Sequence, residues 1–296
     1  MSAPIGVVAH RGASAEKPEH TLAAYELALR AGADAVECDV RLTRDGHLVC
    51  VHDRRVDRTS TGRGVVSGMT LQRMAALDYA SWHVPVPDLP DGGVDGVSGA
   101  GAVDGVDPDA VDRRVFFPPD EGAFAIDPGP DPAVAGTLLT LRQLLELVVA
   151  HDSARVFVET KHPVRYGGLV EAKVVAELHR FGLARPTDPA QARATVMSFS
   201  PSAVWRVHRA APAVPTVLLS HTAAPLAAAV GRTTIGPKIK ILRGDPGIVR
   251  RAAAQGRDTY AWTVDTREDL DLCRSLGVRW VATNRPASLR RWIDSA

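Results

Sequence analysis

Several apolar runs in this chain end on residues that need water or a charged partner. The first run, residues 5–9, is followed at once by His10 and Arg11. A buried strand more commonly ends on Gly, Asn or Asp, which suit the turn that comes next. A strand that ends on a histidine and an arginine therefore indicates that something anionic lies there.

Charged residues two positions apart lie in two further runs. Side chains two apart share one face of a strand, so Glu37 pairs with Asp39, and Glu159 pairs with Lys161. Each pair by itself is also compatible with a solvated or ion-paired strand end. If both point into one pocket, three carboxylates converge and repel one another. A divalent cation removes that conflict, and all-oxygen ligation favours Mg²⁺, Ca²⁺ or Mn²⁺ over zinc.

Two histidines follow strand-like runs in the same part of the chain. His10 closes the first run, and His52 closes the run at 48–53. A single histidine at a strand end is usually structural, but two imidazoles at one rim can act as general base and general acid. Arg11 and Lys161 would supply positive charge for a phosphate. Together these groups indicate a phosphoryl-transfer site.

Strand and helix patterns alternate along most of the chain and would position these residues. Helical stretches such as 21–32, 168–183, 245–256 and 266–277 separate the strands. This order predicts a parallel sheet closed into a (βα)8 TIM barrel, whose active sites lie at the carboxyl ends of the strands. There is one strand candidate too many, so we expect 238–242 to be irregular or outside the barrel. The nine candidate runs are 5–9, 35–43, 48–53, 155–160, 194–199, 216–219, 238–242, 259–264 and 279–283.

The alternation stops at residues 84–136, which are rich in Gly, Pro and Asp and contain no lysine. Without this stretch the chain is close to the roughly 250 residues of a plain barrel. We therefore predict one domain, 1–296, with 84–136 as an insertion after the third strand. The insertion is either a partly disordered surface excursion or a lid over the site.

Composition excludes several classes of protein. The formal net charge is +1, which gives no general attraction to nucleic acid or to an anionic membrane. The three cysteines have no CxxC spacing and predict neither a disulfide framework nor a thiolate zinc site. No run is long and apolar enough for a membrane span, and residues 1–9 do not resemble a signal peptide. We expect a cytoplasmic location without stable membrane insertion; the oligomeric state is left open.

The segment from His10 to Asp53 closely resembles the N-terminal signature of the glycerophosphodiester phosphodiesterase family. The later motifs VETK, MSFSP, AWTVD and TNRP occur in the order that this family shows. The resemblance covers about 1–80 and 138–290. Family members also carry an inserted subdomain after the His-Asp strand, where 84–136 lies.

The resemblance implies a role for each matching position. The two motif histidines imply a catalytic acid–base pair, the three acids imply metal ligands, and the two cations imply phosphate contacts. The aromatic residue of AWTVD implies a wall of the substrate pocket. The residues are His10 and His52, then Glu37, Asp39 and Glu159, then Arg11 and Lys161, and finally Trp262.

The chain departs from the family pattern at two places. His20 stands where the family usually has asparagine, and Asn284 stands where it often has aspartate. Neither position belongs to the proposed metal or acid–base set. Six further histidines are scattered, and we interpret them as surface or packing residues: His83, His151, His162, His179, His208 and His221.

These observations predict a phosphoric diester hydrolase that uses one divalent cation, Mg²⁺ or Ca²⁺, with Mn²⁺ as a further candidate. The expected reaction releases sn-glycerol 3-phosphate and an alcohol from glycerophosphodiesters such as glycerophosphocholine or glycerophosphoethanolamine. Whether the nucleophile is a glycerol hydroxyl or water is open, as is the division of roles between the two histidines. The alternatives are a lysophospholipase D-like enzyme, for which Phe116, Phe117 and Phe124 could contact lipid, and a non-catalytic phosphodiester-binding barrel.

Overall fold

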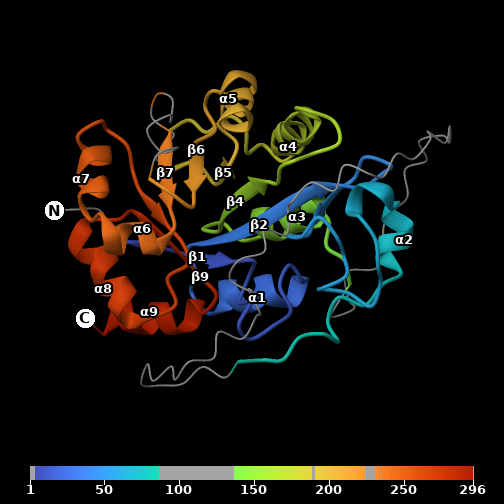
Figure 1. Cartoon of the computed structure of the whole chain (residues 1–296), viewed down its shortest axis with the longest axis horizontal. Coiled ribbons are helices and arrows are strands. Elements are labelled where there is room, and N and C mark those ends of the chain that lie inside the picture. The colour runs from blue at the N-terminus through green and yellow to red at the C-terminus, as the bar shows by residue number, and fades with distance from the viewer. Residues whose placement is uncertain (1–3, 87–136, 189–190, 224–230, 232, 296) are drawn as a thin grey trace.

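A computed structural model describes residues 4–86, 137–188, 191–223, 231 and 233–295. Eight parallel strands stand in the order β7-β6-β5-β4-β2-β1-β9-β8 (Figure 1). Parallel bridges from Ile235 to Thr259 and from Lys238 to Trp262 bring the two outer strands together. The predicted TIM barrel is therefore confirmed, and the barrel is nearly closed. Its strands are β1 (Gly6–His10), β2 (Ala35–Leu42), β4 (Arg155–Thr160), β5 (Ala194–Ser198), β6 (Thr216–Ser220), β7 (Thr234–Pro237), β8 (Tyr260–Ala261) and β9 (Trp280–Thr283).

Helices surround this barrel (Figure 1). Several begin where the sequence offers a threonine cap: Thr21, Thr140 and Thr266 each accept a backbone N–H from the first turn. The helices are α1 (Leu22–Arg30), α2 (Leu71–Ala75), α3 (Leu141–Ala150), α4 (Leu169–Arg180), α5 (Pro201–Ala210), α6 (Ile239–Gly244), α7 (Gly247–Ala253), α8 (Arg267–Leu276) and α9 (Pro286–Asp294), with a 3₁₀ turn η1 at Val66–Gly68.

One strand prediction was wrong, one predicted strand lies outside the barrel, and one barrel strand was missed. The run at 238–242 is not a strand: Lys238 forms a single β-bridge and residues 239–242 begin helix α6, outside the barrel order as expected. Ile239 and Leu242 lie three apart and both are buried, as on one helical face. The run at 48–53 contains β3 (Leu48–Cys50), which pairs antiparallel with β2 and lies outside the barrel order. The barrel takes β7 instead, whose Gly236-Pro237 ending reads as a turn in the sequence.

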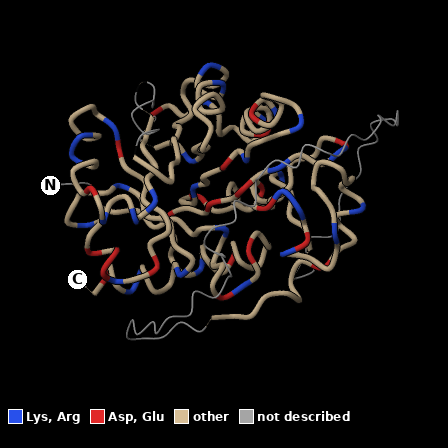
Figure 2. The backbone as a smooth tube through the Cα atoms, viewed as in Figure 1, with Lys and Arg blue, Asp and Glu red and all other residues tan. Residues whose placement is uncertain are grey.

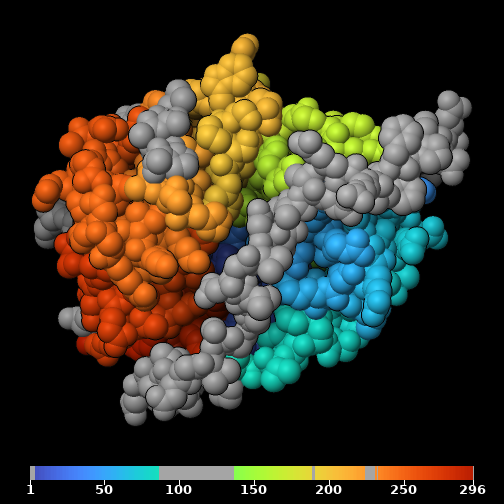
Figure 3. Space-filling model, viewed as in Figure 1, coloured from blue at the N-terminus to red at the C-terminus, as the bar shows by residue number. Residues whose placement is uncertain are grey.

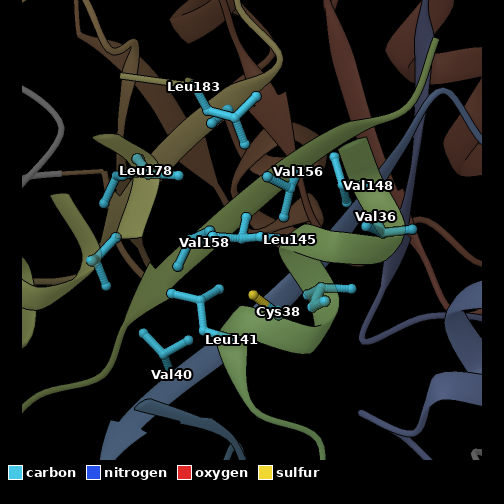
Figure 4. Close-up of a cluster of buried hydrophobic side chains, with 14 of the residues drawn as sticks. Val36, Cys38, Val40, Leu141, Leu145, Val148, Val156, Val158, Leu178 and Leu183 are labelled. Atoms are coloured by element: carbon cyan, nitrogen blue, oxygen red, sulfur yellow. The ribbon is translucent and has the colours of Figure 1, made fainter. Parts of the chain in front are cut away.

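The outer face of β2 and β4 carries much of the core. Val36, Cys38 and Val40 of β2 alternate with residues that point the other way, and all three are buried. Helix α3 packs on them through Leu141 and Leu145 (Figure 4). The polar residues between them on β2 therefore point into the barrel.

A second apolar layer fills the barrel interior. On β1, β2 and β4, Val8, Ala35 and Phe157 belong to it. Two residues further along each strand, on the same face, stand His10, Glu37 and Glu159. The polar site thus stands directly above an apolar plug, at the carboxyl-terminal end of the strands.

Part of the chain forms a smaller layer beside the barrel. Strand β3, η1 and helix α2 share a separate apolar cluster that includes Val49, Leu71 and Met74. In the space-filling view this region and the C-terminal helices α6 to α9 lie on opposite sides of the visible face (Figure 3). Most of the predicted insertion, 87–136, lies outside the described residues. Among the described residues there is no helix that is long and apolar enough to cross a membrane.

Candidate active site

Three carboxylates converge inside the mouth of the barrel. Glu37 and Asp39 come from β2, and Glu159 comes from β4, where it is in register with Asp39. One carboxylate oxygen from each lies within 4.8 Å of the others, and all three side chains are buried. The structure therefore brings together the three acids that the sequence singled out.

These carboxylates have strongly shifted pKa values. Burial and the charges of Asp39 and Glu159 raise the pKa of Glu37 well above its usual range. Burial also raises the pKa of Glu159 to about 7, although Lys161 opposes the rise. Burial alone would raise the pKa of Asp39, but Lys161, His52 and Arg11 together hold it well below its usual range. The cluster holds more negative charge than its buried position favours.

Lys161 and Arg11 supply the nearest positive charge. Lys161 Nζ lies 2.9 Å from Glu159 Oε1 and 3.5 Å from Asp39 Oδ1. Arg11 Nε lies 3.2 Å from Asp39 Oδ2, and the Arg11 backbone N–H donates to Glu37 Oε2 at 2.9 Å. Both cations are thus beside the acids, within reach of an anion bound there.

Arg11 reaches this place through an uncommon backbone conformation. Its φ is +60°, in the left-handed region that costs a non-glycine residue of order 1–3 kcal/mol. The conformation is held by the bond from the Arg11 N–H to Glu37 and by the His20 N–H, which donates to the Arg11 carbonyl at 3.1 Å. Strain of this kind commonly accompanies a functional site.

The acidic cluster fits a hard divalent cation. Its donors are all carboxylate oxygens, the ligands that Mg²⁺ and Ca²⁺ prefer. Glu37 Oε1 is buried and has no hydrogen-bond partner within the described part of the chain. A buried carboxylate oxygen without a donor is costly, and a cation would satisfy it. Glu37, Asp39 and Glu159 are the residues that would hold the ion.

His10 ends β1 beside this cluster. Its Nδ1 lies 2.8 Å from Asn284 Oδ1, which follows β9. Burial and the charge of Arg11 lower the pKa of His10 to about 3, although Asp39 opposes them. The imidazole is therefore neutral at physiological pH in the free protein.

His52 arrives by a different route from the one the sequence predicted. It does not end a barrel strand: it follows β3, which runs antiparallel to β2 and folds back over the barrel mouth. Its Nδ1 lies 2.7 Å from Asp53 Oδ1, and Arg58 Nε donates to Asp53 Oδ2 at 2.6 Å. Burial, Arg11 and Lys161 lower the pKa of His52 to about 4. His10 and His52 also interact electrostatically with each other and with Asp39.

A group of aromatic rings lies beside Lys161. The Trp262 ring makes edge contacts with Phe199 and His221, at centroid distances of 5.4 and 5.2 Å. Phe199 and His221 stack at 4.6 Å, and Lys161 Nζ lies 5.8 Å from the Phe199 ring centroid. Trp262 was expected to wall the pocket; Phe199 was not named, and His221 was interpreted only as a surface or packing residue. Their positions directly after β5 and β6 are the signal that could have revealed them.

Sequence reasoning also missed the residues that support the site. His20, which is buried, lies 3.0 Å from Asp39 Oδ2 through Nε2 and 2.8 Å from the Tyr25 hydroxyl through Nδ1. Arg58 donates to both Glu19 and Asp53, and so links the loop after β1 to the loop after β3. His20 and Asn284 are the two departures from the family pattern, and these departures are the sequence feature that could have revealed their role.

The fold and the charges at its mouth define a class: this is a TIM-barrel enzyme that hydrolyses phosphoric diesters. The model of the glycerophosphoryl diester phosphodiesterase family matches residues 10–288. The chain belongs to this family.

Individual relatives agree with that assignment. "Probable glycerophosphodiester phosphodiesterase 1" of Mycobacterium tuberculosis is 50% identical over 293 residues, which is 97% of this chain and 92% of that protein. A glycerophosphodiester phosphodiesterase of Bacillus subtilis is 31% identical over 94% of this chain and 83% of its own length. A phosphodiesterase of Oleispira antarctica, solved with the product sn-glycerol-3-phosphate, has a TM-score of 0.70 at 19% identity and covers 98% of this chain and 96% of that one; it shows the shared fold.

Proposed function

We propose that this protein hydrolyses glycerophosphodiesters to sn-glycerol 3-phosphate and an alcohol, with a divalent cation held by Glu37, Asp39 and Glu159. The observation that carries the proposal is that this buried triad lies beside two imidazoles, His10 and His52, and two basic side chains, Arg11 and Lys161, at one barrel mouth. The 50% identical mycobacterial relative, a probable glycerophosphodiester phosphodiesterase, supports it. Glycerophosphocholine and glycerophosphoethanolamine are the substrates we expect.

Arg11 and Lys161 bind the phosphate in this proposal. A phosphodiester carries one negative charge, which the Arg11 fork and the Lys161 ammonium would balance. The neighbouring wall of Phe199 and Trp262 would pack against the uncharged part of the substrate. A bound Mg²⁺ or Ca²⁺ would lower the pKa of a hydroxyl that it contacts and screen charge at phosphorus.

The two histidines take different roles because their partners differ. His52 contacts the carboxylate of Asp53, which favours the imidazolium form, whereas His10 contacts an amide oxygen of Asn284. We therefore assign His10 as the base that removes the nucleophile's proton, whether from a glycerol hydroxyl or from water. His52 is then the acid that protonates the departing alkoxide.

The experiment is a metal screen with a panel of glycerophosphodiesters, followed by histidine variants. EDTA should abolish release of sn-glycerol 3-phosphate, and Mg²⁺ or Ca²⁺ should restore it. His10→Ala and His52→Ala should each lower kcat by about 10²–10⁴-fold, the usual contribution of general acid–base catalysis. His179→Ala, at an exposed position on α4, is the matched control and should keep full activity. Full turnover by either active-site variant would end the assignment of that histidine.

The lysophospholipase D-like alternative gains no support from the described residues. Phe116, Phe117 and Phe124, on which it depended, lie outside them. The cytoplasmic location, the absence of nucleic-acid partners and the lid function of 84–136 stay predictions.

A further inference from the structure

Asn284 bridges His10 to an acid, Asp265, that the acid–base mechanism does not use. Its Oδ1 lies 2.8 Å from His10 Nδ1, and its Nδ2 donates to Asp265 Oδ2 at 2.7 Å. Ser14 Oγ also lies 2.9 Å from Asn284 Oδ1. The loop after β8 and the loop after β9 thus meet behind the histidine that ends β1.

The hydrogen-bond partners of Asp265 determine which way the Asn284 amide faces. Asp265 Oδ1 accepts the Asn284 backbone N–H at 2.8 Å and the Thr283 hydroxyl at 2.8 Å. The Thr283 hydroxyl oxygen itself accepts from the Arg285 N–H, so its proton is available for Asp265. Burial raises the pKa of Asp265, and the hydrogen bonds from Asn284 and Thr283 oppose that rise because they favour the ionised form. An ionised carboxylate only accepts, so in this form the amide directs its NH₂ to Asp265 Oδ2 and its oxygen to His10.

An amide oxygen facing His10 selects one tautomer of the ring. Nδ1 must carry the hydrogen, because Asn284 Oδ1 offers only lone pairs. In a neutral imidazole Nε2 is then bare and able to take a proton. Resting on the proposed function, in which His10 is the base, we propose that Asp265 is a positioning residue: through Asn284 it holds His10 in the Nδ1–H tautomer.

The proposal makes a specific prediction for Asp265→Asn. The two donors at Oδ1 pin the new amide oxygen in place, so the new NH₂ group faces Asn284. Two NH₂ groups cannot face each other, and Asn284 turns its oxygen away from His10. The ring must then accept at Nδ1 and carry its hydrogen on Nε2. Its role as base is lost, and kcat should fall by about 10²-fold or more, up to the roughly 10⁴-fold seen when a triad aspartate becomes asparagine.

The double variant Asp265→Asn/Asn284→Asp restores an acceptor for the His10 Nδ1 hydrogen and reverses only the bond between the side chains at 265 and 284. The carboxylate introduced at position 284 accepts from His10 Nδ1 and from the new amide at 265. Its kcat should return to within about 10-fold of the natural protein. Asp269→Asn is the matched control: Asp269 is also buried near the start of α8, but it contacts Arg243 and not His10. That variant should change neither tautomer nor kcat.

The measurement is the ¹⁵N spectrum of the His10 ring, taken at pH 7.5 without substrate, beside steady-state kinetics. The expected result is hydrogen on Nδ1 in the natural protein and the double variant, and on Nε2 in Asp265→Asn. Hydrogen on Nε2 in the natural protein overturns the proposal without any variant having to fold. An unchanged tautomer in Asp265→Asn also overturns it. The spectrum needs no turnover, so it tests the tautomer separately from the proposed function. An active His10→Ala variant would refute the role of His10 as the base, whatever the spectrum shows.

Discussion

Asp39 is the residue at which most of the charges of the site meet. Arg11 and His20 contact its Oδ2, and Lys161 contacts its Oδ1. A buried carboxylate survives in ionised form only with such partners. Its neighbour Glu37 has one oxygen without any partner in the described structure, so the acids are unequally compensated. That inequality is the electrostatic reason to expect a cation between them.

A second buried acid, Glu171 of α4, holds the loop that follows Lys161. His162 Nε2 and Arg206 Nη2 each lie 2.8 Å from Glu171 Oε1. Burial would raise the pKa of Glu171, but these two hydrogen bonds outweigh it and lower the pKa to about 2. A lowered carboxyl pKa stabilises the fold above the unfolded value of 4.5, and the stabilisation is lost as pH falls toward about 2.

Glu171→Gln should therefore lower the free energy of unfolding by about 2 kcal/mol at pH 7, and by progressively less as the pH falls from 4.5 toward 2. Urea unfolding of both proteins across this range measures the difference. Glu177 lies on the same helix as Glu171, and its ion pair with Arg142 of α3 is more exposed. Glu177→Gln should therefore lower the free energy of unfolding by less than about 1 kcal/mol. A constant difference between the natural protein and Glu171→Gln at all pH values would contradict the assignment.

Among the elements, the turn from β1 to α1 has little room for a side chain. Gly12 has φ +83°, and its place against α1 leaves no space for a side chain. An added Cβ would lie 2.8 Å from the carbonyl carbon and the Cβ of Ala24. Because Gly12 follows directly on His10 and Arg11, any shift of this turn would move both of them.

Gly12→Ala should lower the free energy of unfolding by more than about 1 kcal/mol and reduce kcat as well. Both effects are measured on the same preparation, by urea unfolding and by product release. Gly68→Ala is the comparison, since a Cβ there meets no described atom within 4 Å; it should stay within about 0.5 kcal/mol and keep its activity. Equal effects of the two substitutions would show that the close approach to α1 is unimportant.

At the scale of the whole molecule, basic and acidic residues are interspersed over the described backbone (Figure 2), and the net charge is +1. Attraction for an anion or a cation is thus a property of the barrel mouth and not of the general surface. The buried acids oppose folding when nothing balances them, because burial and mutual repulsion both disfavour their charged forms. Cation binding should therefore be linked to the stability of the entire barrel.

Mg²⁺ or Ca²⁺ at 100 times its dissociation constant should raise the free energy of unfolding by about 2.7 kcal/mol. Glu37→Gln should remove most of this gain. In EDTA the same variant should be at least as stable as the natural protein, because Glu37 is costly to bury in charged form. Thermal melts of both proteins, with the ion and in EDTA, measure both expected differences in stability. If the ion stabilises the two proteins equally, Glu37 is not a ligand.

Several features could be predicted from sequence because they depend on local chemistry. The strand period of two put Glu37 and Asp39 on one face and Cys38 on the other, and the structure agrees. Thr266 and Gly277 were expected to bound a helix, and α8 begins and ends with them. Strand β3 was recognised but assigned to the barrel, since an apolar run does not reveal the direction of its partner.

The chain by itself determined the alternation of strands and helices, the barrel that follows from it, and the identity of the acids, imidazoles and cations that could do chemistry. These follow from periodicity and residue type, which are properties of neighbours along the chain. Tertiary structure alone decided that His52 reaches the mouth from an antiparallel strand, and that Asp265 and Asn284 stand behind His10. Hydrogen bonds between residues more than 250 positions apart depend on how the barrel closes, and no local pattern encodes that closure.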